Sequence, residues 1–103
     1  MTPTANMEME ADIRAALRTV IDPELGHNIV DLGMVYDINV QASGLVHIVM
    51  TTTARFCPAS AYLQDAVTTA AGAIAGVGRV SVELTYDPPW SPDRMAPAIA
   101  VRF

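Results

Sequence analysis

The sequence contains a single cysteine, and it stands where the chain is expected to change from one structural element to the next. Cys57 lies in the run TTTARFCPAS and is followed by Pro58, a residue that can open a helix. We therefore expect Cys57 to be the N-cap of a helix. There the helix dipole and the unpaired N–H groups would stabilise a thiolate and lower the pKa of the thiol. Arg55, two residues earlier, would add to this effect.

A thiolate at a helix start suits two kinds of chemistry, because it is the form of cysteine that binds metal ions and that attacks electrophiles. The alternative interpretation is that Cys57 is a small buried apolar side chain, which is the ordinary environment of a free cysteine. Position in the sequence leaves both interpretations open.

Acidic side chains and a histidine gather in a second segment, DPELGHNIVDLG, residues 22–33. Asp22, Glu24, Asp31 and His27 carry carboxylate and imidazole groups of the kind that hold hard metal ions. The alternative is a solvated loop whose carboxylates cap local backbone N–H groups. A loop of this length in a small domain often carries function.

Composition excludes several classes of protein. The chain has 103 residues, six arginines, no lysine and a net charge of −5, which argues against direct binding to nucleic acid. It has no C-x-x-C, no H-E-x-x-H and no glycine-rich phosphate loop. One cysteine excludes an intramolecular disulfide, no apolar run is long enough to span a membrane, and the acidic start differs from a signal peptide. We expect a cytoplasmic protein.

The elements that would position these groups can be predicted from the spacing of apolar residues. Intervals of three and four residues predict a helix over about residues 7–21, stopped by Pro23. The same spacing predicts a second helix that starts at Pro58 and ends at Gly76-Val77-Gly78. Alternation of apolar and polar residues predicts three strands. They cover about residues 36–40, with Tyr36, Ile38 and Val40 on one face, residues 46–50, and residues 80–86.

The first two predicted strands are joined by the turn Ala42-Ser43-Gly44 and form a hairpin. His47 lies on the face opposite Ile48 and is expected at the surface. The tail from Asp87 has four prolines, so regular structure is expected only over Ala98–Phe103, as a short helix or a fourth strand. Trp90, among these prolines, is a rigid aromatic group that would serve as a lid on the core or as a partner contact.

The order α-β-β-α-β predicts an α+β fold, a two-layer sandwich with both helices on one face of a small three-stranded sheet. The helical crossover should lay the third strand parallel to the second or beside it. We expect a single domain over residues 1–103, with residues 1–6 flexible.

Four stretches together resemble a known family. VIDPELGHNIVDLGMVYDI, MTTTARFCP, GVGRVSVEL and DPPWSPDRM, in this order, are similar to the metal–sulfur cluster biosynthesis family, which includes SufT-like proteins, PaaD-like small domains and eukaryotic cytosolic iron–sulfur targeting factors. The resemblance covers about residues 10–97. The chain differs from the family in having Arg55 and Phe56 before the cysteine, and it lacks a cysteine-rich C-terminal extension, which favours the SufT-like branch.

The resemblance implies an α+β iron–sulfur assembly domain that matures clusters or delivers them to client proteins, rather than an enzyme of metabolism. It places the family's motif cysteine on Cys57 and its acidic loop on Asp22 and Glu24, with Asp31 following. The family's threonine pair falls on Thr51 and Thr53. The spacing of these two residues alone does not predict a metal ligand. We expect Thr51, Thr53, Arg55 and Trp90 to be auxiliary or partner contacts.

Three functions compete at this point. The favoured one is a non-catalytic maturation factor that acts through Cys57 and protein contacts. The others are an adaptor whose cysteine is incidental, and a thiol-dependent enzyme with Cys57 as nucleophile and His27 as base. One thiolate cannot hold a cluster that usually takes four cysteines, so we expect at most a transient iron–sulfur cluster or iron bound between subunits. Expected partners are iron–sulfur assembly proteins and client apoproteins, with a homodimer as a candidate assembly and no nucleic acid or membrane.

Overall fold

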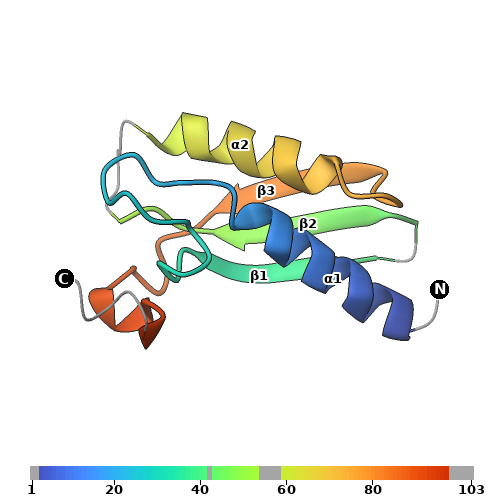
Figure 1. The fold of residues 1–103 in the computed structure, drawn as a ribbon, viewed down its shortest axis with the longest axis horizontal. Helices are drawn as coiled ribbons and strands as arrows, with labels where there is room; N and C mark the ends of the chain where they lie inside the picture. Colours follow the sequence, from blue (N-terminus) through green and yellow to red (C-terminus); the bar gives the residue numbers. More distant parts are fainter. Residues whose placement is uncertain (1–2, 42, 54–58, 98–103) are drawn as a thin grey trace.

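The computed structural model describes residues 3–41, 43–53 and 59–97 of the chain. Within them, helices and strands follow in the predicted α-β-β-α-β order, with a short 3₁₀ turn after the last strand (Figure 1). The α+β fold class is therefore confirmed. The elements are α1 (Pro3–Leu17), β1 (Val35–Val40), β2 (Leu45–Met50), α2 (Ser60–Gly72), β3 (Arg79–Leu84) and the 3₁₀ turn η1 (Pro92–Arg94).

The three strands form one sheet in the order β1-β2-β3. β1 and β2 are an antiparallel hairpin with Ile38 opposite Ile48, and β3 runs parallel to β2 with Val82 beside Ile48. The predicted hairpin and the predicted parallel third strand are both confirmed. The hairpin turn also anchors β3, because the Gly44 carbonyl oxygen accepts a hydrogen bond of 2.8 Å from the Gly78 N–H.

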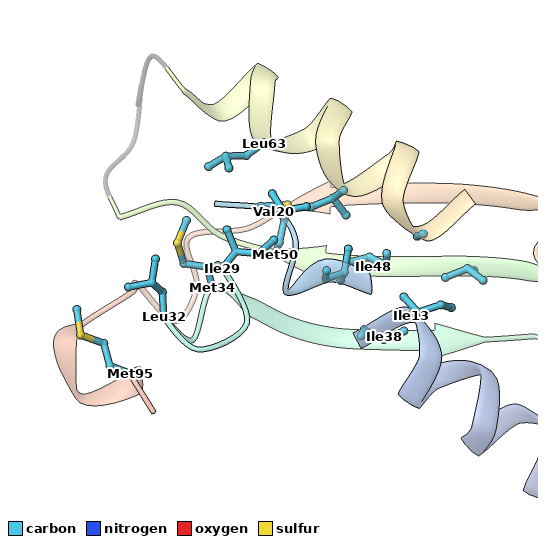
Figure 2. Close-up of a cluster of buried hydrophobic side chains, with 14 residues drawn as sticks. Ile13, Val20, Ile29, Leu32, Met34, Ile38, Ile48, Met50, Leu63 and Met95 are labelled. Atoms are coloured by element: carbon cyan, nitrogen blue, oxygen red, sulfur yellow. The ribbon is translucent and has the colours of Figure 1, made fainter. Parts of the chain in front are cut away.

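Both helices cover the same face of the sheet and contact each other, with α1 against β1 and α2 against β3 (Figure 1). The other face carries His47, whose Nε2 lies 3.3 Å from a Glu83 carboxylate oxygen, as expected for a surface histidine. Figure 2 shows the buried side chains, with Leu32 and Met95 at the loop end of the sheet and Ile13, Ile38 and Ile48 between the two layers. This core comprises Ile13, Leu17, Val20, Ile29, Leu32, Met34, Ile38, Val46, Ile48, Met50, Leu63, Val67, Ala71 and Met95.

The first helix begins earlier than its apolar spacing predicts. It starts at Pro3 rather than near residue 7, and its first turn holds no acidic residue. Apolar spacing detects only the turns that pack against the core, here through Ile13 and Leu17, which are fully buried. The preceding turns continue on helix-forming alanine, methionine and glutamate, and of these Met9 is partly buried against the core.

The first helix also ends earlier, at Leu17 rather than near residue 21. After Leu17 the chain tightens into i to i+3 bonds, such as Val20 N–H to Leu17 O at 3.0 Å. Val20, which belongs to this turn, is buried. Ile21 is 45% exposed and pairs with Asn28 in an isolated β-bridge. Pro23 therefore does not stop the helix, because the helix has already ended at Leu17, six residues earlier.

A β-bulge displaces one residue that was predicted on the apolar face of the first strand. The pairing register shifts between Val35 and Asp37, which makes Tyr36 the extra residue. Ile38 is buried as predicted, but the bulge removes Tyr36 from the face that alternation would give it in common with Ile38. The Tyr36 hydroxyl instead donates a hydrogen bond of 2.9 Å to the Pro88 carbonyl oxygen. The bulge thus joins β1 to the C-terminal segment.

The proline-rich tail contains regular structure where none was expected. Residues 92–94 form η1, and the next residue, Met95, is buried in the core at 8% exposure. Proline fits the first position of a helical turn because its missing N–H has no partner there anyway. The predicted short helix or fourth strand over Ala98–Phe103 lies outside the described residues.

Candidate functional site

Three loop segments meet at one end of the sheet. Parallel strands β2 and β3 both finish at this end, and β1, which runs the other way, begins there (Figure 1). The segments are residues 22–34 before β1, residues 51–53 after β2 and residues 85–97 after β3. All the residues that the sequence analysis singled out for function, apart from those outside the described residues, lie in these segments.

The threonines after β2 are held from both sides. Thr51 N–H donates to Met34 O at 2.8 Å, and Thr51 and Thr52 are at most 1% exposed. The Thr51 hydroxyl donates to Thr52 O at 3.2 Å, so its proton is already used within the protein. Thr53 is half-buried.

Sequence reasoning missed the middle threonine of this run. The Thr52 hydroxyl lies 2.8 Å from the Tyr86 hydroxyl, a hydrogen bond in which either oxygen can donate. It ties the segment that leads to Cys57 to the segment after β3. The sequence held no signal for this pair, because the two hydroxyl groups come from segments 34 residues apart.

The cysteine itself and Arg55 lie outside the described residues. The described start of α2 nevertheless corrects one prediction, because its N-cap is Ala59 and not Cys57. Ala59 has no side-chain capping bond, and its carbonyl oxygen accepts the helical bond from Leu63 N–H at 2.9 Å. Pro58 misled the prediction because proline suits the residues before a helix as well as its first position. The predicted stabilisation of a Cys57 thiolate by an N-cap position therefore does not apply, because Ala59 occupies that position.

The acidic loop is organised around a buried carboxylate. Asp22 is 1% exposed, and its Oδ1 accepts hydrogen bonds from Glu24 N–H at 2.7 Å and Leu25 N–H at 3.1 Å. The backbone closes the loop with Asp22 N–H to His27 O at 2.9 Å and Gly26 N–H to Asp22 O at 2.8 Å. Asp22 therefore caps local N–H groups, which is the second of the two interpretations given for this loop, and Glu24 remains exposed.

The third acidic residue has a different set of contacts. Asp31 Oδ2 accepts a hydrogen bond of 2.9 Å from the Asn28 side-chain amide, and Oδ1 lies 3.7 Å from the Arg18 guanidinium. In the part of the chain that the structure describes, no three histidine, cysteine, aspartate or glutamate side chains come close enough to hold a metal ion. The hard-metal interpretation of the acidic loop therefore finds no support there.

The C-terminal segment is fastened onto the loop before β1. The Trp90 indole N–H donates to Leu32 O at 2.7 Å, and Ala96 N–H donates to Asp31 O at 2.7 Å. Gly33, the residue after Leu32, has a φ of 75°, and a Cβ at this position would lie 2.7 Å from the Arg94 carbonyl carbon. Only a glycine allows this approach. Trp90 is half-buried against the core, which agrees with the lid interpretation.

A stacked pair extends the same contact to β1. The Arg94 guanidinium carbon lies 4.7 Å from the centre of the Tyr36 ring, within the range of a cation–π interaction. Tyr36 is the bulge residue whose hydroxyl donates to Pro88 O. The motifs DLG and DPPWSPDRM, far apart in the sequence, are thus bound to one another at the end of the sheet where residues 51–53 also lie.

Comparison with known proteins identifies the family. The family model described as "Iron-sulfur cluster assembly protein" matches residues 10–83, a span that includes the acidic loop, the threonines and Cys57. The chain belongs to the iron–sulfur cluster assembly family. The predicted resemblance is confirmed.

Two relatives of this iron–sulfur cluster assembly family member are named as Fe-S protein maturation auxiliary factors. It is 40% identical over 90 residues to an Fe-S protein maturation auxiliary factor of Porphyromonas gingivalis, covering 87% of this chain and 86% of that protein. It is 40% identical over 77 residues to the Fe-S protein maturation auxiliary factor SufT of Staphylococcus aureus, covering 75% of this chain and 88% of that protein. The SufT-like branch is therefore confirmed.

The fold of this family member also matches a solved structure. The crystal structure of a domain of unknown function from Bacillus anthracis superposes with a TM-score of 0.93 at 31% identity, covering 98% of this chain and 96% of that one. Among the described residues, no helix is long and apolar enough to cross a membrane.

Proposed function

We propose that this protein helps to mature iron–sulfur proteins by delivering clusters to client apoproteins, acting through Cys57 and protein contacts and without catalysing a metabolic reaction. The observation that carries the proposal is the family match over residues 10–83, which spans Cys57. The names of its relatives, Fe-S protein maturation auxiliary factors, support the same role. A role in the cytoplasm would suit a protein whose thiol has to stay reduced.

The cluster is cargo that the protein holds only in part. One cysteine supplies one thiolate per chain, whereas iron–sulfur clusters usually take four cysteine ligands. The described residues offer no further cluster of metal-binding side chains. A second copy of the chain, a small thiol or the client would complete the shell. Such a shell is easily exchanged, which suits a protein that has to release what it binds.

The acidic loop contributes to this function through the carboxylate of Glu24. Asp22 is buried and Asp31 is half-buried, whereas Glu24 is exposed. Because Glu24 is accessible from outside, we assign it the role of partner contact or weak auxiliary ligand. Partners would be iron–sulfur assembly proteins and client apoproteins.

Anaerobic reconstitution tests the proposal directly. The purified protein is incubated with iron and sulfide, its visible absorption is recorded, and it is mixed with an apo-ferredoxin in the presence of a chelator. We expect weak cluster absorption and rapid transfer to the apo-ferredoxin. Cys57→Ser should abolish both, while Ala61→Ser, an exposed change on α2, should leave both unchanged.

Two results would contradict this function. A brown protein that keeps its cluster against chelator would have a complete ligand shell and would not be a carrier. A Cys57→Ala protein that still supports client maturation in cells lacking the native protein would make the cysteine incidental and the protein an adaptor. Thermal unfolding of each variant separates loss of function from loss of fold.

A further inference from the structure

A groove runs along α2 on the helix-covered side of the molecule. It has a volume of about 430 Å³, within the range of pockets that accept ligands. On α2 its lining residues follow one another at helical spacing, so they form a single stripe beside the buried stripe of Leu63 and Val67. The groove is lined by Tyr62, Asp65, Ala66, Thr69 and Ala70 of α2 and by Thr19 and Val20 after α1.

The early end of α1 creates this groove. Because α1 stops at Leu17, the chain beside α2 continues as the turn with Thr19 and Val20, whose backbone is closed by i to i+3 bonds. The floor on the α2 side is made by Ala66 and Ala70, whose small side chains leave space above them. A helix that continued to residue 21 would bring further side chains toward this stripe.

An exposed aromatic side chain lines the groove. Tyr62 is one of the three large apolar side chains that the structure describes as strongly exposed, at 56%. A large apolar group exposed beside a hollow is typical of a surface that binds another protein. Tyrosine is also a residue type that frequently carries the energy of such contacts.

Among the described lining residues of the groove, one is charged, and its charge is negative. Asp65 is exposed, and among the residues that the structure describes no cation lies within 4 Å of its carboxylate. Arg14 of α1 and Arg18, which follows α1, are paired with other carboxylates, Arg14 with Glu10 at 3.6 Å and Arg18 with Asp31 at 3.7 Å. The chain as a whole carries a net charge of −5. The local and the overall charge therefore attract the same kind of partner, a basic one.

We propose that this groove binds a basic amphipathic segment of a partner protein, with an apolar side chain over Ala66 and Ala70 and an arginine or lysine paired with Asp65. A second copy of the chain is a poor occupant, because two molecules of charge −5 repel each other. Tyr62 is five residues after Cys57, so the partner would dock beside the segment that carries the thiol. The proposal deepens the proposed function and rests on it for the biological identity of the partner.

The binding itself is measured without iron or sulfide, so failure of the groove and failure of cluster delivery are distinguishable. The probe is a blocked peptide of about 15 residues, a length at which isolated helices become marginally stable. It combines leucine and alanine on one face with arginine on the other. A peptide with glutamate at the arginine positions is the matched control. Amide chemical shifts of the whole protein are followed during titration.

We expect the arginine peptide to shift the amide signals of the groove residues of α2 and of Thr19 to Ile21, and the glutamate peptide to leave them unchanged. Tyr62→Ser should weaken binding about tenfold, as for an aromatic side chain at the centre of a contact. Asp65→Asn should weaken it by about two- to fivefold, the range for one exposed ion pair. Asp12→Asn removes the same charge from the exposed side of α1 and should have no effect.

Three outcomes would overturn the proposal. Equal binding of the two peptides would mean that charge does not select the occupant. An equal loss in Asp12→Asn and Asp65→Asn would mean that only the overall charge matters. Concentration-dependent shifts of the same signals without peptide, together with a doubled mass in sedimentation, would assign the groove to a second copy of the chain.

Discussion

The indole N–H of Trp90 donates a hydrogen bond of 2.7 Å to the carbonyl oxygen of Leu32, 58 residues earlier in the chain. Leu32 is fully buried and its neighbour Gly33 lies against the Arg94 backbone, so the bond holds the C-terminal segment on the loop before β1. This contact explains how the described part of the proline-rich tail, up to residue 97, packs on the core.

The Trp90 bond makes a measurable contribution to stability. Trp90→Phe keeps an aromatic ring but removes the donor, which leaves the Leu32 carbonyl without this partner. We expect the free energy of unfolding to fall by about 1–3 kcal/mol. Urea unfolding followed by far-UV circular dichroism measures it, since Trp90 is the only tryptophan and its fluorescence is lost. Tyr62→Phe, at an exposed aromatic residue, should change the value by less than about 0.5 kcal/mol.

Two glycines with nearly equal backbone angles separate strain from contact. Gly26 has a φ of 74° with nothing near its missing side chain, whereas Gly33 has a φ of 75° and faces the Arg94 carbonyl group. Gly26→Ala should cost about 1–2 kcal/mol for the left-handed conformation alone. Gly33→Ala should cost about 1–3 kcal/mol more, because the added methyl group overlaps the Arg94 backbone.

The measurement for the glycine pair is the difference between the two unfolding free energies in urea. Hydrogen exchange at the Ala96 amide adds a local readout, since this N–H is bonded to Asp31 O. Its exchange should accelerate in Gly33→Ala and not in Gly26→Ala. Equal destabilisation by both substitutions would show that the tail can shift to accept a methyl group.

Substitutions of Asp22 and Glu24 in the acidic loop should have different effects, the first on stability and the second on function. Asp22→Ala removes the acceptor of two backbone N–H bonds, so we expect the free energy of unfolding to fall by about 0.5–2 kcal/mol. Asp22→Asn keeps an acceptor oxygen and should recover much of that loss. Glu24→Gln should leave unfolding nearly unchanged but slow cluster transfer to an apo-ferredoxin. A Glu24→Gln protein with wild-type transfer would remove Glu24 from the proposed contacts.

The hydroxyl pair of Thr52 and Tyr86 should be coupled. Thr52→Val and Tyr86→Phe each remove one hydroxyl, and the double variant removes both. We expect a coupling free energy of about 0.5–1.5 kcal/mol in a double-mutant cycle, the usual net value of a hydrogen bond. Additive single effects would mean that the two hydroxyl groups do not depend on each other.

Much of the fold could be predicted because its signals are local. Val46, Ile48 and Met50 recur at every second residue, and Leu63 and Val67 are four residues apart. Both patterns indicate a buried face directly. The hairpin, the second helix and the parallel third strand follow from these patterns. The order of four motifs along the chain also determined the family, which the match over residues 10–83 confirms.

The candidate site could be predicted only in part. The sequence indicated that Asp22, Thr51 and Trp90 belong to motifs, but their local environments decided what each does: Asp22 caps its own loop and Thr51 is buried with its proton donated to Thr52 O. The roles of Cys57 and Arg55, which lie outside the described residues, stay predictions. Thr52 and Tyr86 carried no pattern that distinguishes them from other polar residues.

Only the tertiary structure determined the contacts between segments that are distant in the sequence. By itself the sequence determined which residues alternate and which repeat, because such spacing follows from the geometry of one strand or helix. It could not determine that Tyr36 leaves its strand to meet Pro88, or that Gly33 admits the Arg94 backbone. These contacts join residues more than 50 positions apart, and they depend on the space that remains after both partners have packed on the same core.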